Sequence, residues 1–160
     1  MQFTATQVLH DKLQQLKDLM RHQVPDGDLC AIVERAADLL ISQQVKRRFA
    51  QTEKPRSAAP EAGRKAKPWS RYVPRAVVRE VYSRDGGQCT FVSSDGRRCG
   101  AHDHIELHHE DPFALGGLPT VENLQLLCRS HNALLAEWDF GRAHVQGKRR
   151  EASARNCDQR

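Results

Sequence analysis

The N-terminal part of the chain carries two apolar stripes with helical spacing. Apolar residues recur at intervals of three and four positions, first at Leu9, Leu13, Leu16 and Met20 and then at Leu29, Ile32, Val33, Ala36 and Leu40. This spacing predicts two amphipathic helices. The segment Val24-Pro-Asp-Gly27 interrupts the pattern. Thr4 with Gln7, or Thr6 alone, can cap the first helix, and Asp28 can cap the second. We therefore predict a helical hairpin over residues 1–52.

The hairpin has two interpretations. Residues 1–4 can form a short strand, and strand–helix–helix is the order of a ribbon-helix-helix dimer, which reads DNA with its paired strands. We favour a plain helical hairpin, packed against itself or against a second copy of the chain, because this order of elements is common and its motif is weak. Either interpretation allows a homodimer formed through residues 1–50.

The pattern changes in the second half of the chain. Residues 53–70, EKPRSAAPEAGRKAKPWS, have no periodicity and predict a basic flexible linker. Pro74 opens a helix that Asp85-Gly-Gly87 ends. Residues 89–92 and 97–99 suit a short hairpin across a Ser-Ser-Asp-Gly turn. Strands at residues 105–110 and 124–127 and a helix through Trp138, whose side chain we expect to anchor packing, complete an α+β domain over residues 71–142. Residues 143–160 predict a basic disordered tail.

Charge and hydropathy restrict the partners. The 160 residues carry a net charge of +5, and both the linker region and the C-terminal tail are rich in Lys and Arg. Such charge favours a polyanion, although solvated tails are also often basic. No apolar run approaches the roughly 18 residues of a membrane span, and no signal peptide is visible. We expect a cytoplasmic protein with no membrane partner.

Five cysteines raise the question of a metal site. Cys89 and Cys99 flank the predicted hairpin, while Cys128 and His131 have the spacing of one helix face. In a reducing compartment, such a Cys₃His set suits tetrahedral Zn²⁺. Three alternatives remain: Cys128 as a core thiol, a Cys89–Cys99 disulfide, or His131 as a hydrogen-bonding cap. Of the other two cysteines, we expect Cys30 in the core and Cys157 as a free thiol of the tail.

Two adjacent histidines, His108 and His109, stand at the end of the first predicted strand. Successive strand residues point to opposite faces, so the two imidazoles are suited to different roles. Further motifs follow them in a fixed order: Pro112, Gly116-Gly117, Glu122-Asn-Leu124 and Cys128-Arg-Ser-His-Asn132. Together these residues resemble the HNH endonuclease family, whose ββα-metal core is a two-stranded hairpin followed by a helix.

The resemblance implies a role for each matching residue. His109 matches the general base that activates water, and His108 matches a ligand of a catalytic Mg²⁺ or Mn²⁺. Asn123 matches the central asparagine, whose amide bonds backbone across the loop. Asn132 stands where the family most often has a histidine; its amide oxygen can still bind a hard cation, so the motif is an HNN variant. Three arginines are candidate phosphate contacts: Arg97, Arg98 and Arg129.

Three functions follow from these observations. The first is a metal-dependent endonuclease that hydrolyses phosphodiester bonds in DNA and acts on no small-molecule substrate. The second is a catalytically weak or inactive DNA-binding module of the same fold, with a structural zinc and with Asn132 marking lost catalysis. The third is a zinc finger used for protein contacts. We favour the endonuclease, because a His pair, a loop asparagine and a helical asparagine occur together.

Overall fold

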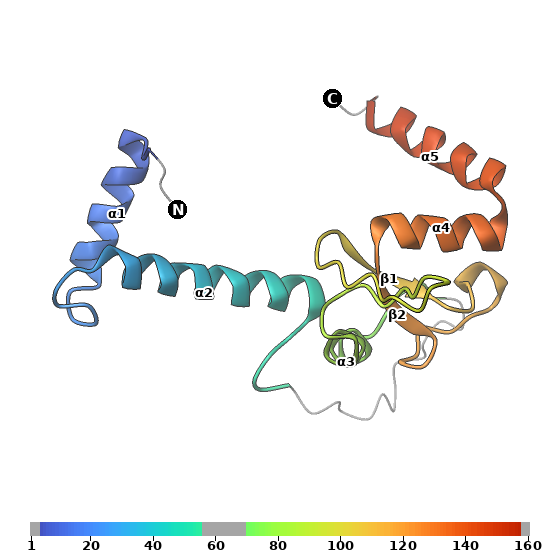
Figure 1. Cartoon of the computed structure of the whole chain (residues 1–160), viewed down its shortest axis with the longest axis horizontal. Coiled ribbons are helices and arrows are strands. Elements are labelled where there is room, and N and C mark those ends of the chain that lie inside the picture. The colour runs from blue at the N-terminus through green and yellow to red at the C-terminus, as the bar shows by residue number, and fades with distance from the viewer. Residues whose placement is uncertain (1–3, 56–69, 158–160) are drawn as a thin grey trace. The chain divides into compact units, whose positions relative to one another are not determined.

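The computed structural model describes residues 4–55 and 70–157. The chain divides into two compact units, Met1–Gln51 and Thr52–Arg160. Figure 1 shows the course of each unit from the N-terminus to the C-terminus. The short strand expected at residues 1–4 lies almost wholly outside the described residues, as does most of the expected linker. Among the described residues, no helix has the length and apolar character needed to cross a membrane.

The first unit contains the two predicted helices, α1 (Gln7–Leu19) and α2 (Leu29–Phe49). The expected N-caps are confirmed: the Thr6 hydroxyl accepts from the amide of Leu9, and the Asp28 carboxylate accepts from the amide of Cys30. Of the residues within the two helices, Ile32 alone is buried. Helix α1 therefore covers little of the apolar face predicted for α2, because one shorter helix cannot cover a helix of 21 residues. Cys30, expected in the core, is exposed.

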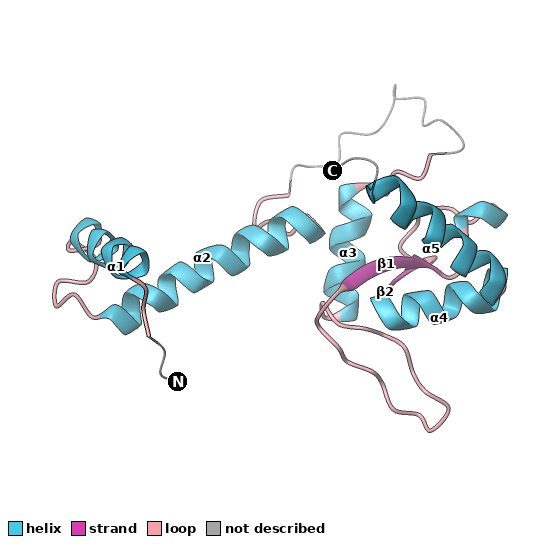
Figure 2. Ribbon diagram, turned by 90° about the horizontal axis from the view of Figure 1, so that it is seen from above, coloured by secondary structure: helices cyan, strands magenta, loops and turns pink. Residues whose placement is uncertain are grey.

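The second unit is built on two antiparallel strands, β1 (Ile105–His109) and β2 (Leu124–Cys128). Their register pairs Ile105 with Cys128 and His109 with Leu124. Helix α3 (Arg75–Asp85) packs against β2, and α4 (Arg129–Phe140) packs against both strands. Figures 1 and 2 show the strand pair between these helices. The predicted mixed α+β fold, with N-terminal helices and a C-terminal strand–strand–helix core, is confirmed.

The core of this unit lies where the strands meet α3. Leu124, Leu126 and Leu127 of β2 and Val81 of α3 have no exposed surface. The run of leucines in β2 makes it apolar on both faces, which suits a strand covered from both sides. Burial of each such side chain stabilises the fold by roughly 1.5–3 kcal/mol. This rigid strand carries Asn123 at one end and Cys128 at the other.

The predicted hairpin of residues 89–99 is present as a short irregular pairing. Val92 and Arg98 form an isolated bridge, and the amide of Cys99 donates to the carbonyl of Phe91 at 2.8 Å. The same segment follows β2, since the amide of Thr90 donates to the carbonyl of Leu126 at 2.9 Å. This bond holds the hairpin beside β2, the strand that ends at Cys128.

Two expectations for the C-terminal region are wrong. The predicted disordered tail forms helix α5 (Arg142–Cys157), which packs against α4. It has no apolar stripe, but Ala, Gln, Lys, Arg and Glu all favour a helix once a neighbour supports it. Gly141, with φ 80°, separates α4 from α5. Trp138, which we expected to anchor packing, is exposed.

Candidate active site and metal centre

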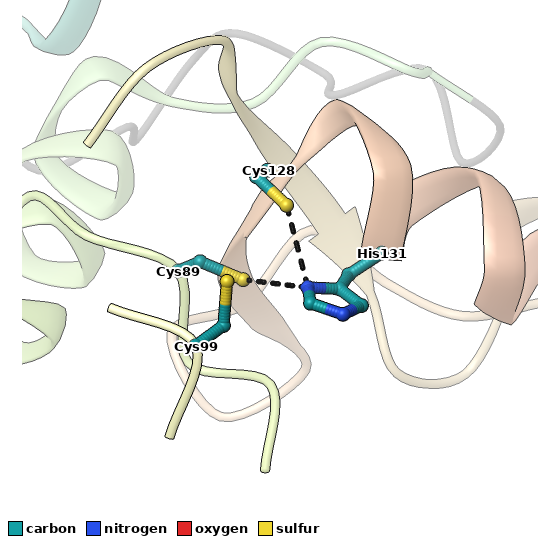
Figure 3. A group of neighbouring side chains, drawn as sticks. All are labelled: Cys89, Cys99, Cys128 and His131. Carbon is teal, nitrogen blue, oxygen red and sulfur yellow. Dashed lines mark hydrogen bonds between the residues drawn. The ribbon is translucent and has the colours of Figure 1, made fainter. Parts of the chain in front are cut away.

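Four side chains from three segments converge beside the sheet (Figure 3). Cys89 and Cys99 come from the irregular hairpin, Cys128 ends β2, and His131 lies in the first turn of α4. Their ligand atoms all lie within 4.8 Å of one another. Nδ1 of His131 is 3.3 Å from Sγ of Cys128 and 3.5 Å from Sγ of Cys89. A tetrahedral zinc with ordinary bond lengths separates such atoms by about 3.6 Å.

The surroundings of this Cys₃His cluster also fit a metal ion. Cys89, Cys99 and Cys128 are free thiols, so all three are available as ligands beside His131. The expected alternative of a Cys89–Cys99 disulfide is therefore wrong. Burial raises the pKa of the Cys89 thiol. A bound cation would reverse this effect by stabilising the thiolate. The cluster is thus compatible with a structural zinc ion.

Phe91 fixes the ring of His131. The two rings are stacked, with centroids 3.9 Å apart and an interplanar angle of 11°. The stacking holds the imidazole in the plane that directs Nδ1 toward the sulfurs. Phe91 was considered in the sequence only as a strand residue, and no spacing rule links it to a residue forty positions later.

The histidine pair lies at the end of β1, and His108 contacts α4. His108 is 8% exposed, and its Nδ1 is 2.8 Å from Oδ1 of Asn132. The other end of the Asn132 amide, Nδ2, donates to Oε2 of Glu106 at 2.6 Å. Glu106 therefore determines that the amide oxygen, and not the amide nitrogen, faces His108. Nothing in the sequence pattern singled out Glu106 for this position.

His109 differs from its neighbour in its surroundings. Its Nε2 atom is buried, and among the described residues it is the buried side-chain polar atom that has no hydrogen-bond partner. Its ring meets the ring of Phe113 edge to face, with centroids 6.3 Å apart. Burial, and to a smaller extent the charge of His108, lower the pKa of His109. The imidazole is therefore neutral near pH 7 and able to accept a proton.

Asn123 closes the loop that follows His109. Its Oδ1 accepts from the amide of Asp111 at 2.7 Å, and its Nδ2 donates to the carbonyls of Asp111 and Leu118. Gly117 passes so close to this bridge that a β-carbon there would collide with the Asp111 carbonyl oxygen. The Asn123 side chain thus ties the loop backbone at Asp111 and Leu118, and Asp111 is two residues after His109.

A cavity of about 450 Å³ opens beside these residues. His108, His109 and Asn132 all line it, so the structure brings these three predicted residues together. Asn123 is not among the residues that line the cavity, and its amide bonds the loop backbone instead. The other lining residues come from the loop and from the helices, and include Arg71, Pro112, Phe113, Ala136, Asp139, Phe140, His144 and Lys148.

The three candidate arginines occupy different environments. Arg97 is exposed and its Nε donates to Asp95 at 2.6 Å, and the exposed Arg129 donates to Glu106 at 3.2 Å. The guanidinium of Arg98 donates to the backbone carbonyls of Cys89 and Asp85. These bonds connect the hairpin to the end of α3, and we assign Arg98 to the fold.

A buried carboxylate, Asp85 at the end of α3, bonds the backbone of β2. It is 5% exposed and accepts from the amide of Leu126 at 2.8 Å. It also binds the Arg84 guanidinium through both oxygens, at 2.7 and 3.1 Å. Arg84 in turn donates to the carbonyls of Val121 and Leu124, on either side of Asn123. In the sequence, Asp85 was interpreted only as the end of a helix.

The comparisons with known proteins agree with this geometry. The HNH endonuclease family profile matches residues 97–133, a stretch that contains β1, β2 and the start of α4. No curated protein and no solved structure was found to match the chain. Proteins with this domain are usually nucleases. The strand–strand–helix core, with its histidine pair, therefore matches the HNH endonuclease family over residues 97–133.

Proposed function

We propose that this protein is a metal-dependent endonuclease that hydrolyses phosphodiester bonds in DNA. The observation that carries the proposal is the shared cavity in which His109 lies beside the His108–Asn132 pair. A neutral imidazole and a pair of ligand atoms are the two components that phosphodiester hydrolysis requires of the protein. The family match supports the same reaction.

The His108–Asn132 pair fits a hard divalent ion such as Mg²⁺ or Mn²⁺. Two neighbouring ligands of an octahedral Mg²⁺ are separated by about 3 Å, and the two ligand atoms here are 2.8 Å apart. Mg²⁺ commonly takes its remaining ligands from water and from substrate phosphate. Bound there, the ion would polarise the scissile phosphate and offset charge on the leaving 3′ oxygen.

His109 takes the role of general base. Because its Nε2 is enclosed, Nδ1 is the ring nitrogen that we expect to take a proton from water in the cavity. The lowered pKa keeps that nitrogen free to accept the proton at neutral pH. Asn123 contributes by holding the Asp111 backbone, which fixes the chain direction immediately after His109.

DNA is the substrate that the charge distribution favours. The net charge is +5, and exposed Arg97 and Arg129 can contact backbone phosphates outside the cavity. Each of these arginines is held by a single acidic partner at the surface, and such exposed pairs are weak enough for phosphate to replace.

A plasmid-nicking assay with Mg²⁺ or Mn²⁺ tests this proposal. We expect the wild-type protein to nick plasmid DNA, and His109→Ala to lower the rate by roughly 10²–10⁴-fold, the usual contribution of a general base. DNA binding by the variant should remain, because the substitution removes no positive charge at neutral pH. Equal rates for the two proteins under every divalent ion would exclude His109 as the base.

The alternative function is a DNA-binding module with little or no catalysis. Asn132 is the observation in its favour, because the family more often has histidine at this position. In that case the protein would bind DNA and hold a structural zinc at the Cys₃His cluster, yet nick no plasmid. Wild-type protein that binds DNA in a salt-dependent manner without cleaving it would select this alternative.

A further inference from the structure

Helix α5 contributes side chains to the same cavity as the histidine pair. His144 and Lys148 lie one turn apart on α5, so they project from one face of the helix, and both line the cavity. Figures 1 and 2 show α5 turning back from the end of α4. The family match ends at residue 133, so α5 lies outside the matched segment.

A second permanent cation, Arg71, lines the cavity from the segment before α3. Its guanidinium lies 5.5 Å from the centre of the Phe113 ring, and that ring contacts His109. This cation–π contact places a permanent positive charge near the proposed general base. Arg71 and the α5 residues thus approach the cavity from different parts of the chain.

We propose that Arg71, His144 and Lys148 form a cationic wall that binds the backbone phosphates of the DNA strand to be cut. This inference rests on the proposed nuclease function and extends it to the residues that hold the substrate. A phosphodiester backbone carries a charge at every nucleotide, so cations beside the histidine pair can bind the phosphates that neighbour the scissile one. The wall supplies them.

The acidic residues near the wall do not neutralise its positive charge. Asp139 is the one acid among the residues that line the cavity, against the two permanent cations Arg71 and Lys148. Lys148 also forms an ion pair with Glu151 at 3.1 Å, in which both side chains are more than half exposed. A solvated pair of this kind is readily exchanged for a phosphate. His144 stands over Phe140, with ring centroids 6.0 Å apart, and can donate a hydrogen bond to a phosphate oxygen.

DNA binding measured at several salt concentrations tests the wall separately from catalysis. The 160-residue chain, purified in the presence of zinc, is titrated into a labelled DNA duplex without added Mg²⁺ or Mn²⁺. We expect Lys148→Ala to flatten the plot of log Kd against log salt by about 0.9, the value for one lost phosphate contact, and Arg71→Ala/Lys148→Ala by about 1.8. Arg150→Ala is the matched control, because Arg150 is an exposed cation of α5 outside the cavity.

Nicking kinetics give the second readout. Lys148→Ala and His144→Ala should raise KM for DNA several-fold and leave kcat within about twofold, since they hold substrate without taking part in proton transfer. If wild-type protein nicks DNA and these variants behave like Arg150→Ala in both assays, the wall is excluded. If the salt slope changes as expected but wild-type protein does not nick, the wall stands as a DNA-binding surface and the nuclease function fails.

Discussion

The amide of Asn132 can present either its oxygen or its nitrogen to His108, and Glu106 selects the oxygen. The Asn132 Nδ2 atom is only a donor, and the Glu106 carboxylate 2.6 Å away is only an acceptor, so the reverse orientation would oppose two oxygens. Arg129 in turn holds the other oxygen of Glu106. A residue that touches no substrate thereby orients a proposed ligand of the catalytic ion.

This role predicts a loss of metal affinity. Glu106→Ala should weaken Mn²⁺ binding by about tenfold or more, the usual effect of removing a group that orients a ligand. Glu106→Gln should lose less, because its carbonyl oxygen can still accept from Asn132. Free Mn²⁺ measured by electron paramagnetic resonance reports the affinity directly, without any cleavage assay. Wild-type affinity in a correctly folded Glu106→Ala protein would show that Asn132 needs no such partner.

The residue scale also shows why the sequence identified some site residues and not others. His108, His109, Asn123 and Asn132 were found because the family motif fixes their types and spacing. Glu106, Phe91 and Asp85 were missed because their roles depend on partners 26 to 41 positions away in the chain. Such pairings exist only after β1, β2 and the helices have packed, and no local pattern encodes them.

At the scale of elements, the Cys₃His cluster brings together side chains from the hairpin of residues 89–99, the end of β2 and the start of α4. The hairpin of residues 89–99 has one isolated bridge of its own, and it meets β2 and α4 at the cluster. A zinc ion there would crosslink the hairpin, the end of β2 and the start of α4. The folding of a small domain gains directly from such a crosslink.

Metal analysis of purified variants tests this crosslink. We expect about one zinc per chain in the wild-type protein and loss of that zinc, with a lower melting temperature, in Cys128→Ser. Cys30→Ser is the matched control, since Cys30 is exposed and lies in the other unit. Retention of zinc by Cys128→Ser would show that the ion is bound elsewhere.

The connection between α3 and β2 depends on one buried ion pair. Asp85→Ala would leave the Leu126 amide without its partner and the Arg84 guanidinium without its counter-charge. We expect the free energy of unfolding to fall by about 3 kcal/mol, near the lower end for a broken buried pair because Arg84 is partly exposed.

Denaturant unfolding compares Asp85→Ala with Asp95→Ala. The pair between Asp95 and Arg97 lies at the surface of the hairpin, so its loss should cost about 1 kcal/mol or less. Similar costs for the two substitutions would show that Asp85 contributes no more than a surface charge. Each variant removes one carboxylate from an arginine partner, so the difference between their unfolding free energies reports the effect of burial and not of charge alone.

Helix α5 marks the limit of sequence reasoning about elements. Amphipathic α1 and the strands were predicted because their apolar residues recur with the period of the element. The C-terminal segment has charged and small residues without such a period, and its composition suggested disorder. Its helix is supported by packing on α4, which is a tertiary effect and is invisible to a search for periodicity.

At the scale of the whole molecule, the first unit has too small a core to account for its own stability. Among the described residues of this unit, the buried apolar ones are Val24, Ile32 and Ala50. Leu39, Leu40 and Ile41 follow one another on α2, each about 60% exposed. Three consecutive helical positions span about 200° of the circumference, more than one neighbouring helix can cover. Units of about this size commonly depend on association for stability.

We propose that a second copy of the chain covers this part of α2. The mass of the protein, measured by sedimentation equilibrium over a range of concentrations, should then correspond to a dimer at the higher concentrations. Leu40→Glu should shift the equilibrium to monomer, because it would place a charge within the apolar contact. Leu115→Glu is the matched control, since Leu115 is at least as exposed but belongs to the second unit.

The comparison separates a specific contact from general apolar exposure. If dimerisation arises from α2, Leu115→Glu should have the mass of the wild-type protein, and zinc content should be the same in all three proteins. A wild-type chain that is monomeric at every concentration, or a dimer that survives Leu40→Glu, would contradict the proposal. A dimer would also give the nuclease two cavities, so loss of dimerisation should convert any double-strand cleavage into nicking while leaving the rate of nicking per cavity unchanged.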